Sequence, residues 1–500
     1  TSIVIPALQS LTVRGNLQTT GAGTVSQAAG GLVMAGGTNI STDSRMISGS
    51  GIVLNNLTID GFTTTGSTFN VNGNFTTNSG KVFEATAGTV VFGSLNRTTS
   101  YIITNSGTTT FFGLNIARST SDSPITTATN FFVKSDLSGN NLQASAGTIT
   151  FNGASTFGGT HNLNNVAITG TLLRMATGSN MGIKGTFTGA AANFDTQAQN
   201  TVIYNGAAQS INNVTYYNLR LSTNNGAVTK TANGNFTALG DLTIDGTVTL
   251  AAGNYTHTLH GNWINNGNFT AGGSTIVFAG TANTQLMGSP AATPTVFNIL
   301  TVDKTTSSVV TTGYDITTNT INLTNGSIST LKTGVDPFGA SAIKVRVLQG
   351  RSGNGWVTGT MTRYMAGGFA EHEVKPNTEY GYVFNGPLVK ITFPTISGSQ
   401  NITSTITEIT VTTVPQPVQG FTNGVPINRL YKVEADGAYT KATLQIQYED
   451  SELNGNTEKE DEEGLKLTPS LTGSSDWEIG QKSGGSIELN WVERQNITNL

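Results

Sequence analysis

Histidine and carboxylate side chains are the groups in this sequence that could bind a metal ion. The four histidines are His161, His257, His260 and His372. His257 and His260 are three residues apart, and on a strand such residues face opposite sides, so the two rings cannot easily reach one ion. Glu371 and Glu373 flank His372 and share one strand face, but no further ligand is near in the sequence. We therefore predict no metal site and interpret Glu371, His372 and Glu373 as exposed, paired residues.

Acidic residues before position 330 could serve acid–base catalysis, as in the β-helix enzymes that cleave polysaccharides. Such enzymes need several Asp or Glu residues on one face, often with Arg or Lys. Asp241 and Asp245 could share a strand face, but Asp245-Gly246 is also a pair typical of turns. The other acids are scattered singly: Asp43, Asp60, Glu84, Asp122, Asp136, Asp195, Asp303 and Asp315. We predict no catalytic residue and keep a polysaccharide-cleaving β-helix as an alternative.

The densest acidic cluster lies later, from Glu449 to Glu463, and holds eight of the chain's 29 acids. Hard oxygen ligands suit calcium, but the pattern of an EF-hand loop is absent. We interpret the cluster as a solvated loop between strands, with calcium binding as the alternative. Threonine runs raise the further possibility of ice binding, but Thr108-Thr-Thr110 and Thr317-Thr-Asn-Thr320 are too irregularly spaced for a flat ice-binding face. No cofactor is predicted.

The composition favours an all-β chain with many turns. Of 500 residues, 61 are Gly and 11% are charged, whereas a typical domain has about 25% charged residues. Val, Ile, Thr and Phe recur throughout, and these residues form strands. The net charge is −4 and no basic stripe exists, so we expect no nucleic-acid partner. No run of 18 apolar residues exists, so we expect no membrane span.

Short strand motifs repeat along the chain as far as position 330. One motif ends in an aromatic residue and is followed by a turn, as in Thr89-Val-Val-Phe92, and a second has the form Leu-x-Ile or Leu-x-Val, as in Leu57-Thr-Ile59. The first motif recurs as Thr148-Ile-Thr-Phe151, Thr201-Val-Ile-Tyr204 and Thr275-Ile-Val-Phe278; relatives of the second begin at Leu114, Val166, Leu219 and Leu300. The intervals between successive copies of the second motif fit multiples of roughly 27 residues. This spacing predicts a β-solenoid, or β-helix, of about twelve coils between residues 11 and 330, with almost no α-helix.

The composition changes near residue 335. Eight of the twelve prolines and three of the four tryptophans follow position 330, and strands such as Ile343–Leu348 and Ala442–Tyr448 are longer and alternate. This spacing predicts a β-sandwich. We therefore expect three parts: an N-terminal strand over residues 1–14, a solenoid shaft over 15–335, and a sandwich over 336–500, with a subdivision near residue 415 as a further possibility.

Apolar strands at both ends of the sequence could pair with a neighbouring subunit by adding to an open sheet edge. An exposed solenoid end could also be covered by head-to-tail stacking, which generates an open filament. The alternative is that both strands close their own domain. The predicted interface residues are Ile3, Val4, Ile5 and Leu8 at one end and Ile487, Leu489 and Trp491 at the other.

Coils such as Gly234–Gly246 resemble the β-solenoid shafts of filamentous-haemagglutinin-like and autotransporter-like bacterial surface proteins. The segments Gly359–Arg363, Ile427–Val433 and Ala442–Glu452 resemble modules in large secreted proteins of type-IX-secreting bacteria, although no clear Gly/Lys-rich sorting tail is present at 490–500. The resemblance implies a surface location and adhesive or structural work, without catalytic residues.

Together with the strand pattern, this resemblance favours a structural, non-enzymatic subunit of an extracellular filament or adhesin. We expect the subunit to assemble with itself, and surface glycans are a second possible partner. A carbohydrate-binding or carbohydrate-cleaving β-helix is the alternative function. The start of the sequence, Thr1-Ser-Ile-Val-Ile-Pro6, has neither Met nor a basic segment, so we expect either a mature end left after removal of a signal peptide or a boundary chosen within a longer chain.

Overall fold

A computed structural model of the chain describes residues 3–5, 9–27, 29–196, 199–288, 295–305, 308–336, 339–353, 355–364, 380–385, 389–393, 408–414, 427–435, 442–448, 450–454, 484–486 and 491–497. The structure is all-β, with 1% helix, and contains a parallel β-solenoid of about 15 turns, which confirms the predicted fold class for this part. Two compact units are present, residues 1–251 and 252–500. They are called unit 1 and unit 2.

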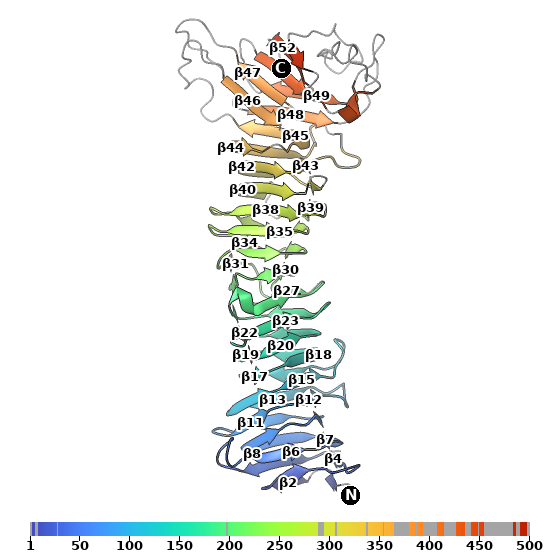
Figure 1. Cartoon of the computed structure of the whole chain (residues 1–500), viewed down its shortest axis with the longest axis vertical. Helices are drawn as coiled ribbons and strands as arrows, with labels where there is room; N and C mark the ends of the chain where they lie inside the picture. The colour runs from blue at the N-terminus through green and yellow to red at the C-terminus, as the bar shows by residue number, and fades with distance from the viewer. Residues whose placement is uncertain are drawn as a thin grey trace. The chain divides into compact units, whose positions relative to one another are not determined.

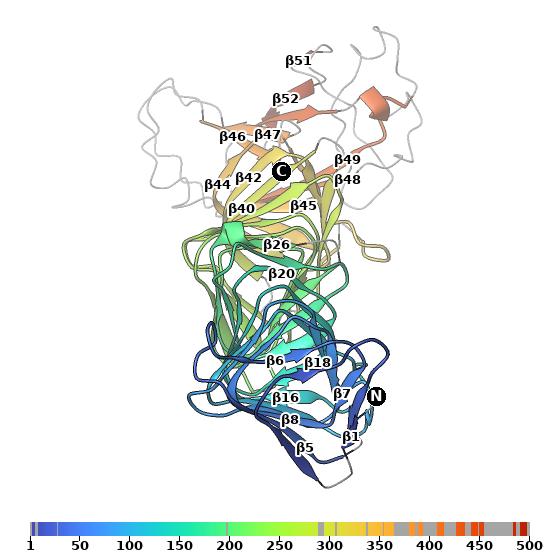
Figure 2. The ribbon, with the colours of Figure 1, turned by 60° about the horizontal axis from the view of Figure 1, so that its bottom comes forward.

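Unit 1 winds through three parallel sheets, called faces A, B and C, and each turn contributes one short strand to each face (Figure 1). Figure 2 brings the first coils forward, with β1 and β7 on face A, β5 and β8 on face B, and β6 on face C. The strands of face A are β1 (Ile3–Ile5), β4 (Val25–Gln27), β7 (Ile52–Leu54), β9 (Phe69–Val71), β12 (Thr89–Phe92), β15 (Gly113–Ile116), the first half of β18 (Asp136–Ala144), β20 (Ala154–Phe157), β23 (Leu172–Met175) and β26 (Phe194–Thr196).

Faces B and C complete the coil. Face B consists of β2 (Ser10–Val13), β5 (Gly31–Gly36), β8 (Asn56–Thr65), β10 (Phe75–Thr77), β13 (Tyr101–Asn105), β16 (Ile125–Thr127), the second half of β18, β21 (Thr160–Leu163), β24 (Asn180–Ile183), β27 (Thr201–Tyr204), β30 (Asn218–Leu221) and β33 (Leu242–Ile244). Face C consists of β3 (Leu17–Gln18), β6 (Arg45–Ser48), the second half of β8, β11 (Val82–Ala85), β14 (Thr108–Phe111), β17 (Phe131–Val133), β19 (Thr148–Phe151), β22 (Asn165–Ile168) and β25 (Phe187–Thr188).

Alternation along each strand places apolar side chains inside the coil and polar ones outside. In β12, Val90 and Phe92 are buried while Thr89 and Val91 are partly exposed. The parallel register then stacks inward residues of successive turns into one apolar column, because in-register strands place equivalent residues above one another. On face B the buried inward residues include Leu32, Leu57, Phe75, Ile125, Leu142, Met181, Val202, Leu219 and Leu242, each 0% exposed.

Asparagine side chains extend the hydrogen bonding between turns at the points where the chain changes face. The Oδ1 atom of Asn56 accepts the N–H of Asn74, 2.8 Å away and one turn later, and Oδ1 of Asn74 accepts the N–H of Ile102 at 3.0 Å. The same contact recurs from Asn130, Asn165 and Asn218 to the next turn. A side-chain oxygen thus replaces a backbone acceptor where the ladder is interrupted. This accounts for the abundance of Asn in a chain of low charge.

The regular ladder changes near residue 190 of unit 1. A short 3₁₀ turn, η1 (Ala191–Asn193), follows β25. After it, β26 still pairs with β23 on face A, and face B continues through β24, β27 and β30. The strands beyond it are β28 (Gln209–Ile211), β31 (Val228–Ala232) and β34 (Val248–Ala251) in one sheet and β29 (Thr215–Tyr216) and β32 (Phe236–Ala238) in another.

Unit 2 contains longer solenoid strands. One face consists of β35 (Thr256–Leu259), β38 (Thr275–Gly280), β40 (Thr295–Lys304), β42 (Ile316–Asn325) and β44 (Lys344–Ser352), and another of β36 (Trp263–Asn265), β39 (Thr284–Met287), β41 (Val309–Thr312) and β43 (Ser327–Ser329); β37 (Asn268–Thr270) lies between β36 and β38 in sequence. β45 (Val357–Tyr364) pairs in parallel with β43 and β44, and antiparallel with β48 (Glu408–Val414), which pairs with β49 (Leu430–Ala435).

The parallel coil therefore continues to Tyr364, beyond the boundary predicted at residue 335. The prediction ended the shaft too early because alternation in Ile343–Leu348 identifies a strand but does not say whether its partner is parallel. Likewise, β1 is part of the first coil through its parallel pairing with β4, rather than a separate N-terminal segment.

The remaining described strands of unit 2 form a five-stranded antiparallel sheet in the order β46-β47-β50-β52-β51. They are β46 (Tyr380–Asn385), β47 (Val389–Phe393), β50 (Ala442–Gln447), β51 (Gly484–Ser486) and β52 (Trp491–Ile497), with the 3₁₀ turn η3 (Asp450–Glu452) after β50. Tyr448, Leu453 and Val492 pack together here, with Ile427 against them. A sandwich of two sheets stays a prediction.

The prediction that one coil has roughly 27 residues is wrong. On neighbouring turns Leu57 is in register with Phe75, Phe75 with Ile103, and Ile125 with Leu142, so the interval from one turn to the next is far from constant. The motif relatives used for the estimate also lie on different faces: Leu57 on face B, Leu114 on face A and Val166 on face C. A strand motif can occur on any of three faces, so intervals between its copies do not measure one turn.

Candidate functional site

Two consecutive corners of unit 1 are longer than the fold requires. Eight residues, 93–100, connect β12 on face A to β13 on face B, and eight more, 117–124, connect β15 to β16 in the next turn. Between β20 and β21 the same change of face takes only Gly158 and Gly159. Gly159 permits this with φ +81°, where a Cβ atom would collide with the carbonyl oxygen of Gly139. We call residues 93–100 and 117–124 the paired corners.

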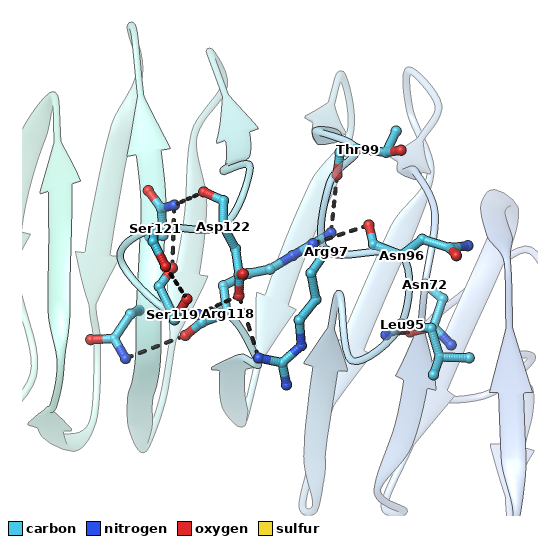
Figure 3. Close-up of polar contacts among 11 residues, drawn as sticks. Asn72, Leu95, Asn96, Arg97, Thr99, Arg118, Ser119, Ser121 and Asp122 are labelled. Carbon is cyan, nitrogen blue, oxygen red and sulfur yellow. Dashed lines mark hydrogen bonds and ion pairs between the residues drawn. The ribbon is translucent and has the colours of Figure 1, made fainter.

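A buried arginine connects the paired corners. Arg118, 4% exposed, lies in the second corner and reaches into the first, where Nη1 donates to the carbonyl of Asn96 and Nη2 to that of Thr99, both at 3.1 Å (Figure 3). Its guanidinium carbon lies 5.6 Å from the ring centroid of Tyr101, a cation–π distance. Gly93 leaves room for this group, because a Cβ atom there would collide with Arg118 Nε.

Ser123 and Asp122 complete the connection between the two corners. The N–H of Ser123 donates to the Arg97 carbonyl at 2.9 Å, and its hydroxyl donates to the Thr98 carbonyl at 2.8 Å. All four carbonyls from Asn96 to Thr99 are therefore bound by the turn above. Nη1 of Arg97 in turn lies 3.3 Å from Oδ2 of Asp122 (Figure 3).

The Asp122 carboxylate is held ionised by its neighbours. Its Oδ2 accepts the N–H of Ser119 at 2.6 Å, and this bond, with smaller contributions from the Ser119 hydroxyl, Arg97 and Arg118, lowers the Asp122 pKa against the opposing effect of burial. Burial lowers the pKa of Arg118, and Asp122 and Tyr101 oppose that shift. The paired corners thus contain two cations and one anion, with Arg118 and its charge in the interior.

The outer surface of the paired corners is exposed and mixed in character. Leu95 is 57% exposed and Ile102 is 49% exposed, and their N–H groups bind the side-chain oxygens of Asn72 and Asn74 in the turn below. Residues 95–100, 120 and 121 are all exposed. Among the residues that the structure describes, the side chains of Asn96, Thr98, Thr99, Ser100 and Thr120 have no hydrogen-bond partner.

The histidines considered as ligands lie apart from one another. His161 is 1% exposed inside the coil, where Nδ1 accepts the N–H of Leu142 at 3.1 Å and Nε2 donates to the Gly158 carbonyl at 3.1 Å. Burial lowers its pKa to about 4, so the ring is neutral at pH 7. His257 is buried against the Ala252 carbonyl, whereas His260, three residues later, is partly exposed.

Several of the scattered solenoid acids pair with bases, whereas Asp60 and Asp303 accept hydrogen bonds from asparagine side chains. Ion pairs join Asp43 to Arg45, Glu84 to Lys134, Asp195 to Arg174, and Asp245 to Arg220. No group of three or more His, Asp or Glu side chains that could hold a metal occurs among the described residues. Residues 371–373 and most of the 449–463 cluster lie outside them.

Two buried lysines are further titratable groups of the solenoid, which the sequence reasoning missed. Lys230, 0% exposed, donates to the carbonyls of Gly206 and Ala207 at 2.8 Å and to Gln209 Oε1 at 2.5 Å. Burial lowers its pKa to about 8. The ammonium saturates its three donors with oxygens of the turn below, which is a structural role. The signal was available in the sequence, because Lys230 shares the inward phase of Val228 and Ala232.

Lys304 of unit 2 repeats this arrangement. Its Nζ donates to the carbonyls of Ala279 and Ala282 at 2.8 Å and to the Thr284 hydroxyl at 2.5 Å, and burial lowers its pKa to about 8. Two inward lysines, at different places in the solenoid, thus stabilise a corner of the turn below by the same three-donor contact.

The predicted interface residues lie in two different settings. β1 pairs with β4 along one edge, and Val4 is 67% exposed. β52 lies between β50 and β51, and Trp491 pairs with Gln447 on one side and Ser486 on the other. Leu8, Ile487 and Leu489 lie outside the described residues, as do the side chains of Ile3 and Ile5.

The fold and the site define a parallel β-solenoid with a preorganised pair of surface corners. No protein-family model matches the chain, and comparison with curated proteins and with solved structures found no match. In the described part of the chain, no helix has the length and apolar character that crossing a membrane requires.

Proposed function

We propose that the chain is a structural, non-catalytic subunit of an extracellular filament or surface adhesin. The observation that supports this best is the apolar column of unit 1. Eleven successive parallel pairings join β2 to β33 on face B. At roughly 4.8 Å per pairing, these strands span about 50 Å of unit 1. A solenoid of this kind supplies stiffness and lateral surface, which suits a shaft.

The pairing of solenoid acids with bases favours this role over polysaccharide cleavage. A glycosidase needs two carboxyl groups facing one substrate bond, with one of them protonated near neutral pH. The ion pairs of Asp195 with Arg174 and of Asp245 with Arg220 instead bring each carboxylate next to a guanidinium. Each of these carboxylates therefore contacts a guanidinium rather than facing a second carboxyl group across a substrate bond.

Self-assembly through strand pairing is part of the proposal, and the two predicted strands are unequal candidates for it. β52 has neighbours on both edges at Trp491, so strand addition there would require its own sheet to open. Among the described residues β1 is paired on one edge only, with β4. We propose β1, with the exposed Val4, as the pairing strand, and the C-terminal antiparallel sheet as one layer of a sandwich.

Immunogold electron microscopy of intact cells that make the protein tests the proposed location and role. Antibodies against the purified chain should label fibres or the outer surface, and brief protease treatment of intact cells should remove the label. Label confined to the cell interior, released only by lysis, would overturn the proposal.

A further inference from the structure

The paired corners are built more elaborately than turning the chain requires. A two-residue corner at Gly158 and Gly159 achieves the same change of face. The paired corners instead order sixteen residues, two runs of eight, and bury the guanidinium of Arg118. Ordering loop residues and desolvating a cation both cost free energy. Loops held in place by a rigid β scaffold are where proteins commonly place recognition residues.

The exposed chemistry of the paired corners limits the class of partner. The segment Ser94-Leu-Asn-Arg-Thr-Thr-Ser-Tyr101 has the Ser, Asn, Arg and Tyr composition of binding loops that combine adaptable hydrogen bonds with rigid contact area. Its carbonyls from Asn96 to Thr99 are already bound, so a peptide cannot add to it as a strand. One exposed arginine, Arg97, next to a carboxylate is too little positive charge for nucleic acid.

With strand addition and nucleic acid excluded, a partner of the paired corners must bind mainly to their exposed hydroxyl and amide groups. Asn96, Thr98, Thr99, Ser100 and Thr120 offer donors and acceptors without partners among the described residues, and Leu95 and Ile102 provide apolar contact beside them. A sugar ring presents the matching combination, hydroxyl groups around a C–H face. We propose that the paired corners bind a saccharide chain. This deepens the adhesin part of the proposed function and rests on it.

A glycan array probed with the purified full-length chain at physiological salt is the first test, followed by calorimetric titration of the best oligosaccharide. The Asn96→Ala/Arg97→Ala variant should lower the affinity about tenfold or more. Both changed side chains are exposed, so the variant should keep the far-ultraviolet circular dichroism of the wild type.

Arg174→Ala is the matched control, since Arg174 and Arg97 are both 52% exposed and each pairs with one aspartate. It should bind as the wild type does. A second variant replaces residues 93–100 with Gly-Gly, as in the native two-residue corner, and combines this with Arg118→Ala, because the deletion removes the carbonyls that the buried guanidinium binds. It should abolish binding, and circular dichroism checks that unit 1 stays folded.

Failure to bind any saccharide at millimolar concentration, or equal affinity in the Asn96→Ala/Arg97→Ala variant and the wild type, would overturn the proposal. Binding that vanishes equally in Arg174→Ala would also overturn it, because it would indicate a general electrostatic effect. None of these results would change the surface labelling in the immunogold experiment, so the saccharide site can fail while the structural role stands.

Discussion

At the scale of single residues, titratable side chains inside the coil tie the stability of unit 1 to pH. His161 occupies an inward position of face B, between Leu142 in the turn below and Met181 in the turn above. The ring must stay neutral there, because Nδ1 accepts the N–H of Leu142 and a protonated nitrogen could not accept it. Protonation is therefore opposed in the folded state and free in the unfolded state.

We predict a loss of stability as pH falls from 6.5 to 4. The folded-state pKa of His161 is lowered to about 4 from 6.5. Within this interval the unfolded chain binds more protons than the folded chain, so stability decreases as pH decreases and levels off below 4. The total loss is about 3 kcal/mol. Urea unfolding at several pH values should show this slope in the wild type and a flatter one in His161→Leu.

The partly exposed His260 supplies the control for this experiment. His260→Ala should retain most of the wild-type dependence between pH 6.5 and 4. An equal slope in the wild type and His161→Leu would show that the buried imidazole does not control acid stability.

Lys230 supports a second prediction at this scale. Replacing it with Met removes the ammonium that binds the carbonyls of Gly206 and Ala207 and the Gln209 side chain. Leaving buried acceptors without a donor costs about 2 kcal/mol. Hydrogen exchange should accelerate in residues 201–211, and Lys304→Met should act in the same way on residues 279–284. Unchanged hydrogen exchange in both variants would show that the two lysines do not stabilise these corners.

The residue scale is where sequence reasoning had the least success. Correct results came from local rules: His257 is buried and His260 is partly exposed, because residues three apart on a strand face opposite sides. The paired corners could not be predicted, because Arg118, Asn96 and Ser123 meet only through the stacking of one turn on the next. Only knowledge of which residues share a corner would have identified them.

At the scale of elements, the strands of unit 1 depend on an interior of interlocking aromatic rings. Phe75 of β10 lies 5.2 Å from Phe83, 6.0 Å from Phe92 and 5.5 Å from Phe111, measured between ring centroids. These rings come from three faces, so they hold the three sheets together within one or two turns. Aromatic pairs add to the burial of apolar surface.

Phe75→Ala should therefore destabilise these turns by about 3–5 kcal/mol, the usual cost of removing a fully buried aromatic ring. The neighbouring Thr76 points outward, and Thr76→Ala should change stability by less than about 0.5 kcal/mol. Hydrogen exchange of β8, β10 and β13 in the two variants measures both effects locally. Similar losses in both would contradict the inward–outward assignment of β10.

Elements were the most predictable level of the structure. The four aromatic-ending motifs are all strands, β12, β19, β27 and part of β38, since alternation of β-branched and aromatic residues is a local property. The face to which each strand belongs is not local. It depends on the lengths of all preceding corners, which in unit 1 vary from none within β8 to eight residues in the paired corners. The same variation made the predicted repeat length wrong.

At the scale of the whole molecule, composition alone was sufficient for the class of fold. A chain with few charges and many Gly, Asn and Thr residues keeps its turns solvated with amides and hydroxyls, and Asn also forms the contacts between turns. The end of the parallel coil was not predictable, because the longer strands after residue 343 fit either a wide coil or a sandwich until their partners are known.

We propose that the stacked parallel turns serve as the shaft of a surface assembly. Cryo-electron microscopy of surface material isolated from cells that make the protein tests it most directly. We expect filaments that contain this chain, with a reflection at about 4.8 Å along the filament axis from the stacked strands. Surface material in which the chain occurs only as dispersed single molecules, with no such repeat, would contradict it.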